Sequence, residues 1–217
     1  MNVLITSGAS EVSQLIAGAL GADHDVRVTE LPDRSGPGMV ACDLGHEEET
    51  GQLCDGIDAI VLVCEAEGLS DSETVDFHSR KMYNLLSAAS EGSVKRVVLL
   101  SSLRLFEAAS PEFEIDEQWA PSVTPDPDIL RYHIAEFVCR EFARAHQLGV
   151  TCLRVGDRVN HDPSDDQVLD SALVEAVSAG IQRTEPGWSV FHVVSSGTRF
   201  VTERIEKVLN VSPRGSA

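Results

Sequence analysis

The stretch MNVLITSGASEVSQLIAGAL, residues 1–20, decides the fold class of this chain. Residues 1–6 form a short apolar run, after which apolar side chains recur at helical spacing, at Val12, Leu15, Ile16, Ala19 and Leu20. A strand, a tight turn and an amphipathic helix, in this order, open a dinucleotide-binding α/β fold. The turn here is rich in serine where such a turn carries glycines. The stretch therefore predicts the shape of a cofactor site and leaves open whether a cofactor binds.

The composition limits the kinds of partner that the chain can have. With 217 residues and 42% hydrophobic content, we expect one domain with a sizeable core. The formal charge of -18, from 35 acidic and 17 basic residues, repels phosphate backbones and anionic membranes. We therefore expect no nucleic-acid partner and no membrane surface. The chain shows no basic leader and no long apolar stretch, so we expect neither a signal peptide nor a membrane span.

The five cysteines contain no CxxC pair and lie largely in apolar runs; they are Cys42, Cys54, Cys64, Cys139 and Cys152. This usage favours buried free thiols in a reducing cytoplasm over disulfides or a metal site. Metal and nucleoside-triphosphate chemistry have no motif in the sequence, which lacks HExxH, a Cys/His cluster and a P-loop. We therefore predict a cytoplasmic protein without a metal.

Strands and helices alternate along the rest of the chain. Further strands are predicted over 25–30, 40–43, 58–65, 95–102, 150–156 and 189–195, and further helices over 72–90, 128–146, 167–179 and 199–209. Residues 46–56 read as a short helix or loop, and residues 103–127 as a long irregular loop. Because several strands are apolar throughout, the pattern predicts a doubly wound parallel sheet covered on both faces. We expect a single α/β domain over 1–217, with its core in about 1–160 and a short C-terminal region in 161–217.

Three blocks of sequence resemble the NAD-dependent epimerase/dehydratase family, the extended short-chain dehydrogenases/reductases. Residues 1–20 are similar to the family's opening unit, and 58–67 with 80–102 to its fourth strand, long helix and serine-ending fifth strand. Residues 135–156, AEFVCREFARAHQLGVTCLRVG, closely resemble its next helix and sixth strand. TCLRVG and FHVVSSGTRF are most like the uronate dehydrogenase branch. The resemblance implies a Rossmann-like fold, and because the chain is shorter than most members, a reduced C-terminal substrate region.

The family's turn reads TGxxGxxG, and here its three glycines fall on Ser7, Ser10 and Ser13. In the family the glycines permit the tight turn, the approach of backbone to pyrophosphate and the packing of helix on strand. Serine at the first two positions adds a Cβ where a positive φ is costly, whereas Ser13 is small enough to preserve packing. Glu11 adds a carboxylate at the helix N-terminus, where a pyrophosphate needs positive potential. The remaining turn residues that the resemblance assigns to the cofactor are Gly8 and Val12.

Other positions of the implied cofactor site are better preserved. Glu30 ends the second predicted strand, where an acid accepts the ribose hydroxyls and favours NAD over NADP. Asp43 and Leu44 resemble the family's Asp-Leu pair beside the adenine. An adenosine half-site is therefore more credible than a site for a whole dinucleotide, and we expect NAD to bind weakly or not at all.

Family members transfer hydride with a Ser or Thr, a Tyr and a Lys that lowers the pKa of the Tyr. The resemblance assigns these roles to Ser102 and Tyr132, but in YxxxK register Glu136 replaces the Lys, and a carboxylate there would raise the pKa of the phenol. In a second register, which aligns Glu136 with a family Glu, the Lys position falls on Tyr132 and the Tyr position on Asp128. The pair is broken in both. Arg131 is the nearest cation, and adjacent helical side chains are expected to point apart.

Two other groups of titratable residues have a functional and an ordinary interpretation. Asp128, Tyr132, His133 and Glu136 share one helix and form either an acid–base cluster or a solvated helix face. His161 and Asp162 follow the sixth strand, where family loops reach the substrate, or else form a solvated loop.

Three functions remain open from the sequence. The first is a degenerate family member, weakly binding or non-catalytic, that acts as a sensor or partner subunit. The second is an active NAD-dependent oxidoreductase or epimerase on a sugar or sugar acid that uses non-standard residues. The third is a structural subunit, because family members often dimerise through helices that correspond to 72–90 and 128–146. Four side chains on these helices then belong either to a homodimer interface or to the core: Met82, Tyr83, Phe137 and Phe142.

Overall fold

Seven parallel strands form the central sheet of the computed structural model, which describes residues 1–45, 48–65, 68–145 and 147–214. In spatial order they are β3 (Val40–Ala41), β2 (Asp25–Glu30), β1 (Asn2–Ile5), β4 (Ala59–Val63), β5 (Arg96–Ser102), β6 (Gly149–Val155) and β9 (Gly187–Val193). Two short strands, β7 (Asp157–Val159) and β8 (Gln167–Leu169), form a second parallel pair. The predicted doubly wound α/β fold is confirmed.

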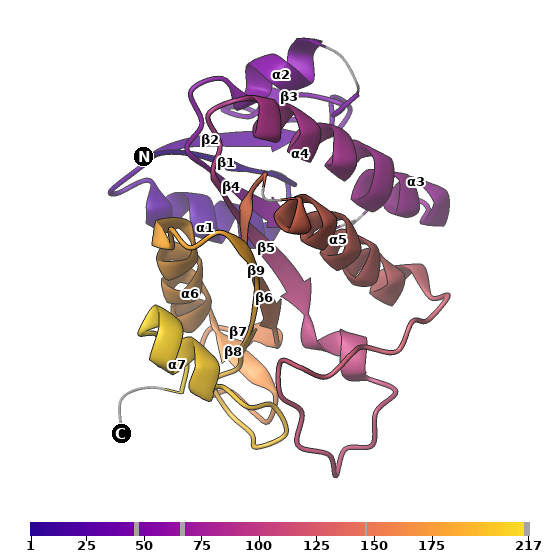
Figure 1. The fold of residues 1–217 in the computed structure, drawn as a ribbon, viewed down its shortest axis with the longest axis vertical. Coiled ribbons are helices and arrows are strands. Elements are labelled where there is room, and N and C mark those ends of the chain that lie inside the picture. Colours follow the sequence, from indigo (N-terminus) through magenta and orange to yellow (C-terminus); the bar gives the residue numbers. More distant parts are fainter. Residues whose placement is uncertain (46–47, 66–67, 146, 215–217) are drawn as a thin grey trace.

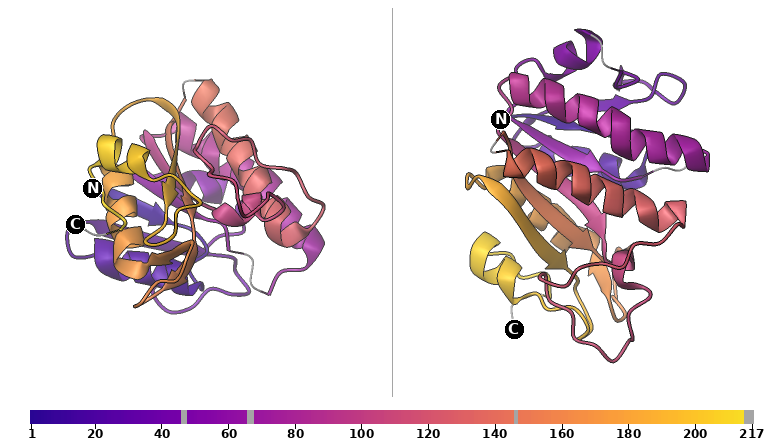
Figure 2. Two further views of the ribbon diagram at one scale, coloured as in Figure 1. Left: turned by 90° about the horizontal axis from the view of Figure 1, so that it is seen from below. Right: turned by 45° about the vertical axis from the view of Figure 1, so that its right-hand side comes forward.

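Helices cover both faces of the sheet (Figures 1 and 2). One face carries α2 (Glu48–Cys54), α3 (Asp71–Asp76), a π-helical turn η1 (Phe77–Lys81), α4 (Met82–Glu91) and α5 (Pro127–Arg144). The other carries α1 (Glu11–Leu20), α6 (Asp170–Gln182) and α7 (Glu203–Leu209). A 3₁₀ turn, η2 (Leu103–Phe106), follows β5. None of the helices in the described ranges has both the length and the apolar composition of a membrane span.

Strand β4 shows why the sheet needs both helical layers. All five of its residues are buried. Ile60 and Leu62 pack into the core on the α4–α5 side, whereas Val61 and Val63 pack into the core on the α1–α6 side. A strand buried on both faces reads as a continuous apolar run, which is how it is recognised in the sequence.

The order of the strands fixes the place of a ligand site. The chain runs outward from β1 to β2 and β3, then returns to the other side of β1 with β4. In open α/β sheets, ligands bind beyond the carboxyl ends of the strands where the order reverses in this way. The β1–α1 turn and the segments after β4 and β5 all lie at that edge.

Some predicted elements differ from the observed ones. The helix predicted over 72–90 is divided by η1, whose wider turn brings the neighbouring Phe77 and His78 both into the interior. Residues 167–169 form β8 because they pair with β7, so α6 begins only at Asp170. The last helix begins at Glu203 because Phe200 forms an isolated bridge with Ile115. The predicted helix to His146 ends at Arg144, and residues 46, 47 and 146 lie outside the described ranges.

Strand β9 and helix α6 come from the predicted C-terminal region at 161–217. Strand β9 pairs with β6 along its whole length and so completes the main sheet. Helix α6 packs against β5 and β6. This part of the chain therefore contributes to the core as well as to the carboxyl edge of the sheet.

Candidate functional site

The β1–α1 turn is held together by the serines that stand in the glycine positions. Ser7 has a φ of 53°, in the left-handed region, so the strain predicted at this position is present. Its Oγ donates to the carbonyl of Val63 at 2.9 Å. The positive φ predicted at Ser10 is wrong: the φ of Ser10 is -75°, and the residue is the N-cap of α1. Its Oγ accepts a hydrogen bond from the Ser13 N–H at 3.1 Å, as N-cap serines do.

Two further turn residues explain why the strand–turn–helix unit still packs. Ser13 is fully buried and its Oγ donates to the carbonyl of Thr6 at 2.8 Å, so the close packing predicted for this position is confirmed. A Cβ on Gly8 would lie 2.5 Å from Cγ1 of Val28, so glycine is required there. The hydroxyls of Ser7, Ser10 and Ser13 therefore all bond within the protein.

The first turn of α1 offers two backbone donors together with a carboxylate. The N–H groups of Glu11 and Val12 are the first two of the helix and have no intrahelical acceptor. Such groups suit an anion such as a pyrophosphate. The exposed Glu11 adds a negative charge at the same place. The turn therefore keeps two N–H groups that could bind an anion, whereas the charge of Glu11 repels an anion at the same place.

Glu30 lies beside the turn, as predicted, and its carboxylate is already engaged. The side chain is buried, with Oε2 accepting from the Ala9 N–H at 2.9 Å and Oε1 from the Leu31 N–H at 2.8 Å. A ribose in this place would have to share or displace these two bonds.

The adenosine side of the site is filled by the protein. The gap between the turn, Glu30, Leu44 and Phe77 has no space for a water molecule. Leu44 has a φ of 54°, and its carbonyl accepts from Asn84 Nδ2 at 3.1 Å, while Lys81 Nζ donates to the carbonyl of Asp43. The Asp43 carboxylate accepts from the Gly45 N–H at 2.7 Å. An adenine does not fit between these residues as they stand.

A cavity of about 260 Å³ opens at the carboxyl ends of β4, β5 and β6. Its walls include Val12, Ser102, Arg104, Tyr132 and Arg158. The residues assigned from the sequence to cofactor and to catalysis thus meet here, Val12 from the turn and Ser102 with Tyr132 from the implied catalytic set. The free space of the cleft therefore lies beside Ser102 and Tyr132. The sequence predicts the reverse, that the adenosine half of the site is the better preserved one.

Tyr132 is buried, and its partner is Arg131. Nη2 of Arg131 donates to the phenol oxygen at 2.9 Å, and the guanidinium carbon lies 4.8 Å from the ring centroid. The prediction that these adjacent side chains point apart is wrong, because the long arginine side chain folds back over the neighbouring ring. Burial raises the pKa of Tyr132 above its usual value, while Arg131 lowers it.

Glu136 faces the core, away from any acid–base cluster. Its carboxylate accepts from Arg154 Nε and Nη2, each at 2.8 Å, and from Ser101 Oγ at 2.7 Å. The interpretation as a solvated helix face is therefore wrong for Glu136 and Tyr132. Both side chains are buried because α5 lies flat on the sheet. Asp128 is exposed and His133 half-buried, so the four predicted residues do not converge.

The remaining predicted candidates lie away from the cavity. His161 and Asp162 form a 3.5 Å contact between strongly exposed side chains, as expected for a solvated loop. Within the ranges that the structure describes, no three His, Cys, Asp or Glu side chains are grouped to hold a metal. All five cysteines are buried free thiols, as predicted.

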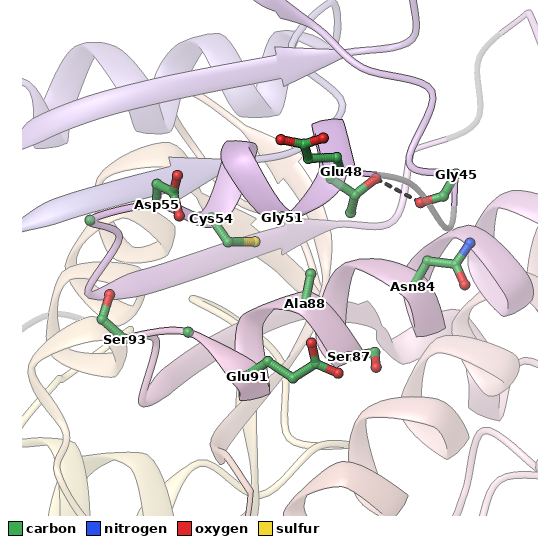
Figure 3. A pocket seen from close by; sticks show the side chains of 13 residues that line it. Gly45, Glu48, Gly51, Cys54, Asp55, Asn84, Ser87, Ala88, Glu91 and Ser93 are labelled. Atoms are coloured by element: carbon green, nitrogen blue, oxygen red, sulfur yellow. Dashed lines mark hydrogen bonds between the residues drawn. The ribbon is translucent and has the colours of Figure 1, made fainter.

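A larger groove, of about 630 Å³, is lined by residues of α2 and α4 (Figure 3). Glu48, Asp55 and Glu91 lie along it, and Asp55 and Ser93 place one end near the amino ends of β4 and β5. It contains none of the residues predicted for cofactor or catalysis. We therefore place the candidate site in the smaller cavity at the carboxyl edge.

The four aromatic and methionine side chains on α4 and α5 divide into two pairs. Met82 and Phe142 are buried in the core. Tyr83 and Phe137 are more than half exposed, on helices that pack against each other. An interface on this face would use the second pair.

The chain is similar to known proteins both in sequence profile and in fold. A sequence profile described as NAD(P)H-binding matches residues 12–185. A mutated uronate dehydrogenase superposes with a TM-score of 0.82 at 20% identity, over 99% of this chain and 82% of that one. A mutant of uronate dehydrogenase from Agrobacterium tumefaciens, complexed with NAD, gives 0.83 at 17% identity, over 99% and 84%.

UDP-N-acetylglucosamine 4-epimerase from Bacillus cereus superposes with a TM-score of 0.78 at 14% identity, over 100% of this chain and 95% of that one. At these identities the likeness is one of fold. None of the curated protein sequences compared with the chain matches it.

Proposed function

The chain belongs to the NAD(P)H-binding family and has the fold of the short-chain dehydrogenases/reductases, and from this premise we propose that it binds nucleotide weakly and is non-catalytic. Its Rossmann-like scaffold then serves as a ligand sensor or as the partner subunit of another protein.

The filled adenosine side is the observation that carries this proposal. Both carboxylate oxygens of Glu30 accept hydrogen bonds from backbone N–H groups. The gap beside Leu44 and Phe77 has no room for a water molecule. The turn adds a strained Ser7 and the negative charge of Glu11. Binding of NAD would have to reopen this side at the expense of existing contacts, which weakens its affinity.

The loss of the Tyr–Lys pair supports the non-catalytic part of the proposal. The sequence has no lysine between Lys95 and Lys207, so α5 contributes none to the cavity. Steady-state assays with NAD against uronates, sugar nucleotides and simple alcohols should show no turnover above background. A turnover number in the ordinary range of about 1–1000 per second would overturn the proposal.

A second function is favoured by one specific observation. Ser102 and Tyr132 line the same cavity at the carboxyl edge, so the chain retains a hydroxyl and a phenol next to open space. An oxidoreductase or epimerase acting on a sugar or sugar acid would hold its transferred proton on Tyr132. Turnover that disappears in Tyr132→Phe and persists in Tyr83→Phe, whose residue lies outside the cavity, would establish this function instead.

We also propose a homodimer through α4 and α5. The exposed Tyr83 and Phe137 on adjacent helices support it, because large apolar side chains at an interface lose their contact with water. Sedimentation equilibrium should give a dimer for the wild type and a monomer for Tyr83→Glu with Phe137→Glu. A wild-type monomer at all concentrations would contradict it. The buried free thiols support a cytoplasmic location.

A further inference from the structure

The segment between η2 and α5, residues 107–126, carries two large aromatic side chains on its surface. Phe113 is 50% exposed and Trp119 is 39% exposed, and their ring centroids lie 5.5 Å apart at an interplanar angle of 45°. The segment projects from the end of the molecule opposite to α2 (Figure 1). Aromatic side chains that pack on each other at the surface, and not in the core, indicate an interaction site.

Two backbone turns fix how these rings are presented. The N–H of Phe113 donates to the carbonyl of Ser110 at 3.1 Å, and the N–H of Trp119 donates to the carbonyl of Asp116 at 3.3 Å. Each bond joins residues three apart, as in a β-turn, so each ring stands at the end of a closed turn.

A buried anchor between the two turns ties the segment to the body of the protein. Ile115 is fully buried; its N–H donates to the carbonyl of Arg199 at 2.7 Å, and its carbonyl accepts from the Val201 N–H at 3.0 Å. The carbonyl of Trp119 also accepts from Arg154 Nη1 at 3.5 Å. A surface that is ordered in this way loses little conformational freedom when a partner binds.

Negative charge without a counter-charge flanks the aromatic pair. Residues 105–130 contain no lysine or arginine. Glu112 and Glu114 lie on either side of Phe113 in the chain, and both are exposed. In the described part of the chain, the ion pair of this segment joins Glu107 to Arg104 at its beginning, and neither Glu112 nor Glu114 has such a partner.

Exposed aromatic rings next to free carboxylates complement an arginine side chain. A guanidinium stacks on an aromatic face, most favourably on that of tryptophan, and donates two parallel N–H bonds to a carboxylate. The cavities described above include neither Phe113 nor Trp119. The surface is therefore open, and it suits an extended segment of another chain better than a small molecule that needs enclosing walls.

We propose that Phe113 and Trp119, with Glu112 and Glu114, form a docking surface for an arginine-containing basic segment of a partner protein. This surface deepens the partner-subunit form of the proposed function and rests on it. The partner's arginines stack on the two rings and pair with the two carboxylates.

The test uses an oligoarginine peptide as the probe and the protein's own tryptophans as reporters. The chain has two tryptophans, so a Trp188→Phe variant assigns their indole N–H resonances. We expect oligoarginine to shift the Trp119 resonance saturably and to leave that of Trp188, at the start of β9, in place. An oligolysine peptide of equal length should bind about threefold more weakly or worse, because an ammonium stacks less well on the rings. Equal affinities, or no shift of Trp119, would overturn the proposal.

A control of equal charge separates this surface from the overall negative charge of the protein. Glu112→Gln with Glu114→Gln should weaken oligoarginine binding about fivefold or more. Glu48→Gln with Glu91→Gln removes the same charge from two exposed acids of the groove at the other end of the molecule, and should leave the affinity unchanged. Equal weakening by the two double variants would show that the peptide follows total charge and would overturn the docking surface.

The aromatic part of the surface has its own variant. Phe113→Leu with Trp119→Leu, followed by calorimetry, should weaken oligoarginine binding and remove the preference for arginine over lysine. Circular dichroism checks its fold, and Phe113→Leu alone serves if the double variant does not fold. No nucleotide enters these experiments, so tight NAD binding would refute the proposed function without changing their outcome. An unchanged preference for arginine in a folded ring variant would overturn the role of the rings.

Discussion

Replacing Glu136 by leucine should destabilise the protein strongly, because it leaves the buried Arg154 without its partner. The two side chains are only 10% and 5% exposed, and Arg154 directs two hydrogen bonds of 2.8 Å at the carboxylate. Removing one member of such a pair costs about 3–5 kcal/mol, since an uncompensated charge stays buried. For a chain of this size the midpoint of thermal unfolding should fall by roughly 6–20 °C.

Urea unfolding followed by far-ultraviolet circular dichroism measures this loss directly. The matched control is Glu141→Gln, because the Glu141–Arg144 pair on the same helix is 3.1 Å long but largely exposed. It should cost about 0.5 kcal/mol or less. Glu136→Leu combined with Arg154→Met should recover most of the stability, as apolar replacements of buried pairs do.

A loss below about 1 kcal/mol for Glu136→Leu, or a double variant no more stable than the single one, would refute the reasoning. The pair matters to the site because Glu136 lies one helical turn after Tyr132 on α5. By joining α5 to β6 it sets the position of the phenol on the cavity.

Three further predictions concern the turn, the nucleotide and pH. Ser7→Gly with Glu11→Gln should tighten NAD binding about tenfold in calorimetry, by removing a side chain and a like charge near the pyrophosphate; no gain would contradict this. Any dinucleotide binding should favour NAD over NADP, because Glu30 repels a 2′-phosphate, and equal affinities would contradict this. Burial lowers the pKa of His78 to about 4 and of His192 to about 3, so the unfolded chain takes up their protons first as the pH falls below 6.5. The free energy of unfolding should therefore fall by up to about 1.4 kcal/mol per pH unit for each histidine between pH 6.5 and those values, and equal stability at pH 7 and pH 5 would contradict it.

The fold could be predicted from the sequence because its signals are local. The apolar run of β4 and the helical spacing in α1 each follow from a few neighbouring residues. The short strands β7 and β8 have no local sequence signal, because they exist only through their pairing with each other. The π-helical turn cannot be told from the sequence, because its period differs little from that of the surrounding helix.

The candidate site was predictable only in part, because its contacts join residues far apart in the chain. The serines at the glycine positions are visible in the sequence, but their hydrogen bonds to Val63 and Thr6 are not. A lone arginine in an apolar strand, Arg154, was a signal for a buried acid partner, and Glu136 is that partner. No local sequence pattern predicts that Phe77 fills the adenosine side, because the place of Phe77 depends on how η1 packs on the sheet.

Isothermal titration of the wild-type protein with NAD tests the central claim most directly. Because the adenosine side is filled and the turn carries Ser7 and Glu11, we predict either no saturable heat or a dissociation constant far weaker than micromolar. Circular dichroism of the same sample should confirm that the protein is folded. A dissociation constant of about 1 μM or tighter, at ordinary salt concentration, would show that the site opens readily for the whole cofactor and would contradict the account.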